Sequence, residues 1–355
     1  MKIEQLDKNF AIVNQDNGEE KVVYTIPDEK FDLYGVYYDQ TEGQFRRLHK
    51  DLADKVSAQV KCWGACTSGG RIRFRTNSST IGLEATYPAL VRFSHMPDTG
   101  CGGFTLLKKT DKGYKLVNTF RLDLGKEVLN QTISVDGGVM TEYILFLPLY
   151  NTVGSIKITL DKNATVTGGE KYRDVKPILY YGSSITQGGC ASRPDNSYQA
   201  LISKWNNIDF VNLGFSGGAK AEELMVQHIL SYDVSLFVLD YDHNAPNVEH
   251  LKKTHYKLYK RYREVHPDTP ILIMSKPDYE RYPHNKERFK VVQETYKKAK
   301  EEGDNNVYFI AGKDLFGKKD RENCTVDGTH PNDLGFYRMA KKIYKKIIEI
   351  NQIFR

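Results

Sequence analysis

The sequence has 355 residues, of which 40% are hydrophobic and 27% are charged, and its formal net charge is +6. This is the composition of an ordinary globular protein, and the length allows two domains of common size. No apolar run approaches the ~18 residues that a membrane helix requires, and the polar N-terminus lacks the apolar stretch of a secretory signal. We therefore expect a cytoplasmic protein with no membrane partner.

The cysteines and the basic charge point to no special class of protein. Five scattered cysteines, Cys62, Cys66, Cys101, Cys190 and Cys324, are too few for a disulfide framework. Cys62 and Cys66 have no histidine nearby, so we expect no metal site. Most lysines alternate with apolar residues at helical spacing, as on a solvated helix face. Because no recognition motif accompanies them, we expect no nucleic-acid partner.

The N-terminal half has the two-residue period of β-strands. Residues 71–86 alternate apolar and polar side chains on both sides of a turn, and residues 142–150 and 155–161 are short and rich in β-branched and aromatic residues. Asp-Gly and Gly-Gly pairs mark turns between such segments. The pattern predicts a β-sandwich, jelly-roll-like accessory domain over residues 1–170, with one short helix within 44–60.

The C-terminal half, residues 171–355, repeats an apolar strand followed by a helical stretch about five times. This order predicts a parallel sheet with helices on both faces, reached through a linker at 167–177. The expected strands are 177–182, 209–214, 235–240, 270–275 and 306–312. In such a sheet, ligands bind beyond the carboxyl ends of the strands, so the residues that follow each strand are the candidates for chemistry.

The first strand is followed by "GSSITQG", residues 182–188. A serine at the start of a turn after a buried strand can present its hydroxyl to a cleft, but it needs a base within hydrogen-bond reach to act as a nucleophile. A Ser/Thr turn that caps the next segment explains the same residues. This motif alone does not show which of its hydroxyl groups, if any, acts as a nucleophile.

The second and third strand ends offer donors for an oxyanion. Glycines in "NLGFSGG", residues 212–218, let a backbone N–H approach a ligand, although a helix cap explains the motif as well. In "LDYDHNAPN", residues 239–247, the Asn244 amide is the candidate donor. We interpret Asp240, Asp242 and His243 as structural or substrate-facing groups, because crowded neighbours at one strand end point in different directions.

The last loop, "DGTHP", places Asp327 three residues before His330. A carboxylate at this spacing can hold one imidazole nitrogen while the other faces outward as a general base, although a surface loop would also carry these residues. Together the four strand ends supply a nucleophile, oxyanion donors, a base and an orienting acid. These are the parts that acyl transfer requires.

The four motifs, in this order, resemble the blocks of the SGNH hydrolases, also called GDSL-type esterases. The first block, Gly-Asp-Ser-x-Thr-x-Gly in the family, is here "GSSITQG", which implies Ser184 as the nucleophile, and the last block implies Asp327 and His330 as its partners. The resemblance further implies a flavodoxin-like fold, no cofactor and an oxyanion hole formed by Ser184, Gly214 and Asn244. Ser183 stands where the family usually has Asp, and the neighbours of Asn244 also differ.

The preceding β half resembles the accessory module of two-domain bacterial SGNH esterases, a subgroup that includes carbohydrate O-acetyl esterases. The resemblance implies hydrolysis of acetyl esters on oligosaccharides or small molecules. An esterase or thioesterase for longer acyl chains, an acyltransferase, and a carbohydrate-binding protein with an inactive hydrolase domain are the alternatives. A homo-oligomer is compatible with the sequence.

Substrate recognition has the weakest sequence signal. Arg193, which follows the nucleophile motif, is a candidate to face the cleft, and Trp63 and Tyr87 from the β half are candidates to stack on a sugar ring. A surface ion pair explains Arg193 equally well. Half-buried aromatic residues of a sandwich would look like Trp63 and Tyr87.

Overall fold

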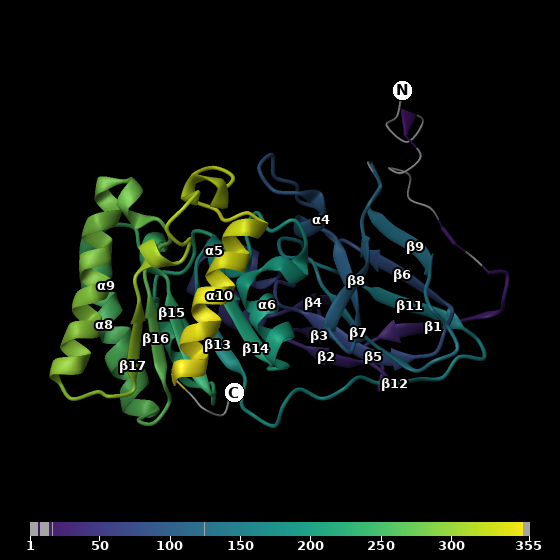
Figure 1. The fold of residues 1–355 in the computed structure, drawn as a ribbon, viewed down its shortest axis with the longest axis horizontal. Helices are drawn as coiled ribbons and strands as arrows, with labels where there is room; N and C mark the ends of the chain where they lie inside the picture. The colour runs from purple at the N-terminus through teal and green to yellow at the C-terminus, as the bar shows by residue number, and fades with distance from the viewer. Residues whose placement is uncertain (1–5, 8–13, 16, 124, 351–355) are drawn as a thin grey trace.

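The computed structural model describes residues 6–7, 14–15, 17–123 and 125–350. Two antiparallel sheets come first along the chain, and a parallel sheet flanked by helices follows beside them (Figure 1). The predicted architecture, an α/β domain with a parallel sheet preceded by a β-rich region, is confirmed. The boundary between residues 170 and 171 stays a prediction.

The two antiparallel sheets enclose one apolar core. Alternate residues point into it, for example Ile81, Leu83 and Ala85 from one sheet and Ile72 and Phe74 from the other. The first sheet contains, in spatial order, β1 (Lys21–Ile26), β11 (Ile156–Asp161), β6 (Thr80–Thr86) and β9 (Val128–Ser134). The second contains β12 (Val166–Gly168), β5 (Arg71–Thr76), β10 (Thr141–Phe146), β7 (Phe104–Thr110) and β8 (Gly113–Phe120), and β2 (Asp32–Tyr34) also pairs with β5.

The predicted helix within 44–60 is partly wrong. A small hairpin of β3 (Tyr37–Asp39) and β4 (Gln44–Arg46) takes the first residues, and two short helices, α2 (Lys50–Val56) and α3 (Ala58–Gly64), follow. The break falls at Ser57, whose backbone is extended and whose hydroxyl accepts a hydrogen bond from Val60 N at 3.3 Å. An N-cap serine therefore starts a second helix. A further short helix, α4 (Asp98–Cys101), precedes β7.

The parallel sheet has the spatial order β14-β13-β15-β16-β17. Its strands are β13 (Ile178–Gly182), β14 (Phe210–Gly214), β15 (Leu236–Asp240), β16 (Ile271–Met274) and β17 (Val307–Ile310). Its helices are α5 (Ser184–Gln187), α6 (Tyr198–Asn206), α7 (Glu223–Leu230), α8 (Val248–Val265), α9 (Pro283–Glu301) and α10 (Asp333–Ile350). Short 3-10 turns η2 (Pro194–Asn196), η3 (Asp242–Asn244), η4 (Tyr279–Arg281), η5 (Gly312–Asp314) and η6 (Arg321–Cys324) lie in the connections.

Both faces of the parallel sheet are covered, as predicted. Ile178 and Tyr180 of β13 pack in a core that contains residues of α6 and α10, together with residues of the N-terminal region. Leu179 and Tyr181, which point the other way, pack with residues of α7, α8 and α9. Because successive strand residues alternate between faces, these near-continuous apolar strands are what a doubly covered sheet requires.

Buried arginines join the two regions. Arg71 and Arg73 lie on the face of β5 that points away from the sandwich core, and both are fully buried. Arg71 forms an ion pair with Asp209, which immediately precedes β14. Arg73 pairs with Glu142 at 3.0 Å and also donates to Asn207 Oδ1 at 2.9 Å. Arg71 and Arg73 therefore lie on a second buried face of β5, whereas Arg75, which continues the alternation, is exposed.

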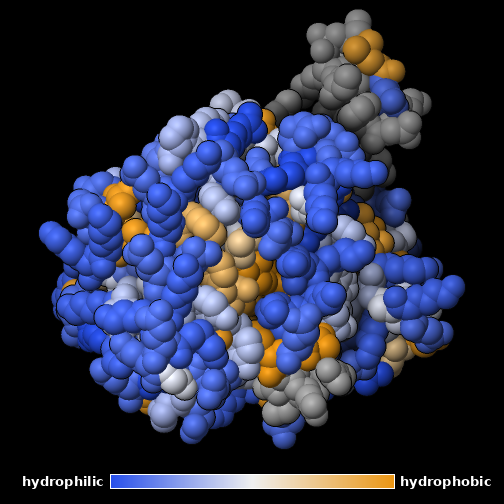
Figure 2. Space-filling view, turned by 60° about the vertical axis from the view of Figure 1, so that its left-hand side comes forward, coloured by the Kyte–Doolittle hydropathy of each residue, from blue (hydrophilic) through white to orange (hydrophobic). Residues whose placement is uncertain are grey.

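The surface drawn in Figure 2 is mostly hydrophilic, with hydrophobic residues gathered near the middle of that face. None of the described helices is both long enough and apolar enough to cross a lipid bilayer.

Candidate active site

The turn after β13 gives its two serines different surroundings. Ser183 is fully buried and caps α5, because its hydroxyl accepts a hydrogen bond from Ile185 N at 3.1 Å. Ser184 is the first residue of α5, and its Oγ lies 2.9 Å from His330 Nε2. The capping explanation therefore holds for Ser183, whereas the hydroxyl of Ser184 faces a potential base.

The last loop orients His330 toward this hydroxyl. His330 Nδ1 lies 2.7 Å from Asp327 Oδ2, and the backbone N–H of His330 donates to Asp327 Oδ1 at 2.8 Å. Thr329 N also donates to that oxygen, at 2.9 Å. With a proton on Nδ1, Nε2 is free to accept the proton of Ser184. The structure thus brings the three predicted residues into one hydrogen-bonded chain.

The carboxyl group of Asp327 is held in its ionised form. Partial burial acts to raise its pKa, but hydrogen bonds from the His330 backbone, the His330 ring and the Thr329 backbone outweigh burial and lower the pKa to about 2. The carboxylate is therefore negative at neutral pH. Its charge stabilises the imidazolium that forms when His330 takes up a proton.

Gly214, predicted as an oxyanion donor, has its N–H occupied. That N–H donates to Asn212 Oδ1 at 2.8 Å, so the structure does not present it to the site. A glycine is required at this position for a steric reason, because a Cβ there would lie 2.2 Å from Gln187 N. Gly214 lets α5 pack on the end of β14.

Gly217, in the same "NLGFSGG" motif, is the better donor. It is exposed with φ of +66°, and its N–H has no hydrogen-bond partner among the described residues. The preceding N–H of Ser216 donates to Gln187 Oε1 at 3.0 Å, which ties this turn to α5, the helix that begins at Ser184. Of the other two glycines in the motif, Gly214 donates to Asn212 Oδ1 and Gly218 donates to Phe215 O at 2.9 Å, so their N–H groups are occupied.

Asn244 lies in η3, beyond the end of β15, as predicted. Its Oδ1 accepts a hydrogen bond from Ala219 N at 3.4 Å. This contact turns the amide so that Nδ2 is its remaining donor, and Nδ2 has no partner among the described residues. Asn244 is therefore oriented to donate to a ligand.

Aromatic residues of the N-terminal region border the site, and the sequence did not single most of them out. Tyr150 OH donates to Ser184 O at 3.1 Å. The ring of Trp63 lies 5.5 Å from that of Tyr150, and the ring of His95 lies 5.7 Å from that of His330, measured between centroids. The ring of Phe93 packs against the rings of Trp63, Tyr150 and His95. Trp63, a predicted substrate contact, thus packs against Tyr150, which in turn contacts the turn that carries Ser184.

Two other candidates have structural contacts. Arg193 donates to Asp195 Oδ1 at 3.0 Å and to Asn196 Oδ1 at 3.2 Å, so the ion-pair explanation fits it. Tyr87 is only 6% exposed, and its hydroxyl donates to Gly102 O in the sandwich core. The prediction that Tyr87 stacks on a sugar is wrong, because its ring is not accessible.

Among the described residues, His95, Cys190 and His330 bring ligand-type atoms within 4.8 Å of one another. Burial, assisted by the charge of Asp327, raises the pKa of the Cys190 thiol to about 12. His330 Nε2 in this group already contacts the Ser184 hydroxyl.

Sequence comparisons identify two adjoining families along the chain. The GDSL-like lipase/acylhydrolase family matches residues 175–349, and the N-terminal region of SGNH-hydrolase-type esterases matches residues 23–166. The chain belongs to the GDSL-like lipase/acylhydrolase (SGNH) family. No curated protein matches the sequence.

Solved structures show the same SGNH fold with its preceding β region. A protein described as a GDSL-like lipase from Bacteroides ovatus superposes with a TM-score of 0.83 at 28% identity, covering 93% of this chain and 98% of its own. The salicylyl-acyltransferase SsfX3 of a tetracycline biosynthetic pathway gives 0.76 at 18%, covering 95% and 98%. A family two carbohydrate esterase from Clostridium thermocellum, in complex with cellohexaose, gives 0.59 at 13%, covering 92% and 98%.

Asp240, at the end of β15 of this SGNH fold, is a structural carboxyl group. It is 1% exposed, its Oδ2 accepts the Thr186 hydroxyl at 3.1 Å, and its Oδ1 has no partner among the described residues. Burial, together with the charge of Asp242, raises the pKa of Asp240 well above its usual range. The folded protein therefore holds this proton to a higher pH than the unfolded chain does.

This raised pKa predicts a pH-dependent effect of Asp240→Asn. In the unfolded chain Asp240 loses its proton above about pH 4, whereas the folded chain keeps it, so rising pH destabilises the wild type at this position. Relative to the wild type, the variant should gain up to about 1.4 kcal/mol in free energy of unfolding per pH unit above that value, while the folded carboxyl stays protonated. Urea unfolding at about pH 5 and about pH 8 measures this gain.

Asp314→Asn, a change at an exposed position, is the matched control and should show no such trend. A stability difference between Asp240→Asn and wild type that stays constant over this pH range would mean that Asp240 is ionised in the folded protein.

Proposed function

We propose that this protein is a serine esterase that hydrolyses short-chain acyl esters, chiefly acetyl groups on oligosaccharides. The observation that carries the proposal is the hydrogen-bonded chain from Ser184 through His330 to Asp327 at the carboxyl edge of the sheet. Membership in the SGNH family supports ester chemistry. The carbohydrate esterase that shares the fold supports an oligosaccharide substrate.

In the proposed mechanism His330 Nε2 takes the proton of Ser184 Oγ as that oxygen attacks the ester carbonyl carbon. Asp327 keeps the imidazole in the tautomer that has a proton on Nδ1 and stabilises the imidazolium. The tetrahedral intermediate collapses when the bond to the alcohol oxygen breaks, and His330 donates the proton to that oxygen. Water then attacks the acyl-enzyme with the same proton transfers, which releases the acid and restores Ser184.

The oxyanion hole in this proposal consists of the Ser184 N–H, the Gly217 N–H and Asn244 Nδ2. Gly217 replaces Gly214, whose N–H donates to Asn212. Each such donor typically contributes ~3 kcal/mol of transition-state stabilisation. The proposal further includes an accessory domain over residues 1–170, a catalytic domain over 171–355 and a cytoplasmic location.

An acyltransferase is the second candidate function, because SsfX3 shares the fold over 95% of this chain. It would use the same acyl-enzyme but pass the acyl group to an alcohol other than water. Product analysis in the presence of an added alcohol acceptor separates the two activities, since a transferase yields a new ester in place of the free acid.

The proposed activity is tested with a panel of acetylated oligosaccharides, together with p-nitrophenyl acetate, butyrate and octanoate. We expect acetate release from the sugars and a rate that falls with acyl length. The Ser184→Ala protein, which should fold normally, is the control and should release none. Hydrolysis of octanoate in preference to acetate would replace the proposal with an esterase for longer chains, and sugar binding without hydrolysis would indicate a binding protein.

Asn244→Ala should lower kcat while KM changes little, because its amide donates mainly to the charge that develops in the transition state. The expected loss is on the order of 10²–10³ in kcat. Steady-state kinetics with p-nitrophenyl acetate measures it. Asn247→Ala, which removes the cap of α8 on the same connection, is the control for a general effect on folding. An unchanged kcat in Asn244→Ala would remove Asn244 from the oxyanion hole.

A further inference from the structure

A cationic pocket adjoins the proposed catalytic base. It has a volume of about 340 Å³ and is lined by residues that include His243, Lys276, His284, Arg288 and Thr329. Lys276 follows the carboxyl end of β16, which is the edge where ligands bind in parallel sheets. Thr329 immediately precedes His330, so the pocket opens beside the group that would protonate the leaving alcohol.

Lys276 is a buried ammonium group without an ion-pair partner. The residue is only 5% exposed, and its Nζ makes a single long contact, to Pro277 O at 3.4 Å. Among the described residues, no carboxylate lies within ion-pair distance of Nζ. Burying a charge is costly unless it is paired. The side chain is therefore held in a position where a partner anion is missing.

The carboxylates around Lys276 are committed to other groups. Asp242 Oδ1 contacts His243 Nδ1, and its Oδ2 accepts the backbone N–H of Lys276, each at 3.0 Å. Asp278 pairs with Arg321, and Asp327 pairs with His330. The charges of Asp242, Asp278 and Asp327 act to raise the pKa of Lys276 but do not overcome burial, which lowers it. None of these acids supplies the missing contact.

The guanidinium of Arg288 adds further N–H donors to the pocket. Arg288 Nη1 donates to Asp242 O and to Ala245 O, both at 2.7 Å, which fixes the guanidinium while its remaining N–H groups have no partner among the described residues. His243 Nε2 is also buried without a partner, but because Nδ1 donates to the Asp242 carboxylate and burial lowers the pKa of the ring, Nε2 is an acceptor and does not serve an anion. The lining contains no Asp or Glu side chain. The unpartnered N–H groups of Arg288 and Lys276 are suited to an anion.

Another cation, Arg281, lies against the loop that contains Asp327 and His330. The guanidinium of Arg281 packs against Gly328, where a Cβ would lie 2.9 Å from Arg281 Cζ. Gly328 also has φ of +82°. A glycine is therefore favoured there both by the close approach of Arg281 and by the left-handed backbone. A guanidinium therefore packs on the Asp327–His330 loop, whose Thr329 lines the pocket.

We propose that this pocket binds a carboxylate on the alcohol part of the ester, as in a uronic acid residue of an acetylated oligosaccharide. The inference rests on the proposed esterase function. The alcohol part is favoured because the pocket lies beside His330, which protonates the leaving alcohol oxygen. A carboxylate is favoured because acidic sugars carry one, and its two oxygens match a guanidinium and an ammonium together.

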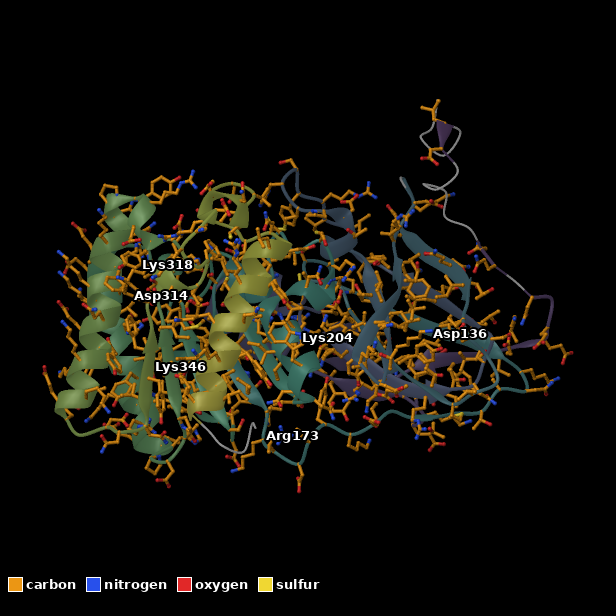
Figure 3. All side chains as sticks on the ribbon, in the orientation of Figure 1. Asp136, Arg173, Lys204, Asp314, Lys318 and Lys346 are labelled. Carbon is orange, nitrogen blue, oxygen red and sulfur yellow. The ribbon has the colours of Figure 1, made fainter. Side chains whose placement is uncertain are left out.

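The test compares two esters that differ only in the carboxylate, a mono-O-acetylated methyl glucuronoside and the corresponding methyl glucoside. We expect the wild-type kcat/KM for the uronoside to exceed that for the glucoside by about tenfold or more. Lys276→Met should bring this ratio close to one, and Lys276→Arg should retain part of it. Lys318→Met, at an exposed lysine labelled in Figure 3, is the control and should leave the ratio unchanged.

An equal wild-type rate on the two esters, or an unchanged ratio in Lys276→Met, would overturn the proposal. So would a preference for p-nitrophenyl hemisuccinate over p-nitrophenyl acetate without a preference for the uronoside, because the anion would then lie on the acyl side. His284→Glu, at an exposed position on the pocket lining, is the second variant if Lys276→Met does not fold, and it should lower the same ratio.

Calorimetric titration of the Ser184→Ala protein with methyl glucuronoside separates this inference from the proposed function. Binding that is lost in Ser184→Ala/Lys276→Met, combined with no ester hydrolysis by the wild type, would retain the pocket and reject the esterase. Hydrolysis of both esters at equal rates, without such binding, would retain the esterase and reject the pocket.

Discussion

The site depends on two glycines, Gly182 and Gly214, at the strand ends where the turn that carries Ser184 packs on the sheet. A Cβ on Gly182 would lie 2.4 Å from Asp240 O and 2.1 Å from Thr186 Oγ1, and a Cβ on Gly214 would lie 2.2 Å from Gln187 N. Only glycine fits at these two strand ends. Since α5 rests directly on β13, β14 and β15, Ser184 is fixed opposite the Asp327–His330 loop at hydrogen-bond distance.

The N-terminal β region supports the same turn from the other side. Tyr150 OH donates to Ser184 O at 3.1 Å, Gln187 Nε2 donates to Leu149 O at 3.2 Å, and the Ser68 hydroxyl donates to Gln187 O. These contacts are buried, and buried hydrogen bonds hold the side chains they join in one arrangement. The β region therefore forms one wall of the candidate site as well as a separate set of sheets.

Much of this organisation could be predicted from the sequence, because it follows from local patterns. The change from a two-residue period to alternating strands and helices predicted both kinds of sheet, and the spacing of Asp327 and His330 predicted their hydrogen bond. The choice between Gly214 and Gly217 could not be predicted, because it depends on where the Asn212 side chain points. The break at Ser57 and the ion pair of Arg193 are likewise set by single side-chain contacts.

The binding role proposed for Lys276 could not be predicted from the sequence either. Its sequence context, "SKPD" after an apolar strand, indicates only that it lies at the ligand edge of the sheet. What makes it a candidate for binding is its burial without a partner, and that depends on Asp242, Asp278 and Asp327 each being paired elsewhere. Such a property belongs to the tertiary structure and has no signal in the spacing of residues.

The most direct test of the central claim is rapid-quench mass spectrometry of the protein mixed with p-nitrophenyl acetate, followed by peptide mapping. The account predicts one acetyl group on Ser184 during turnover, none in Ser184→Ala, and the same acetylated peptide in Ser183→Ala. Acetylation at Ser183 or at another residue, or full turnover by Ser184→Ala, would contradict it.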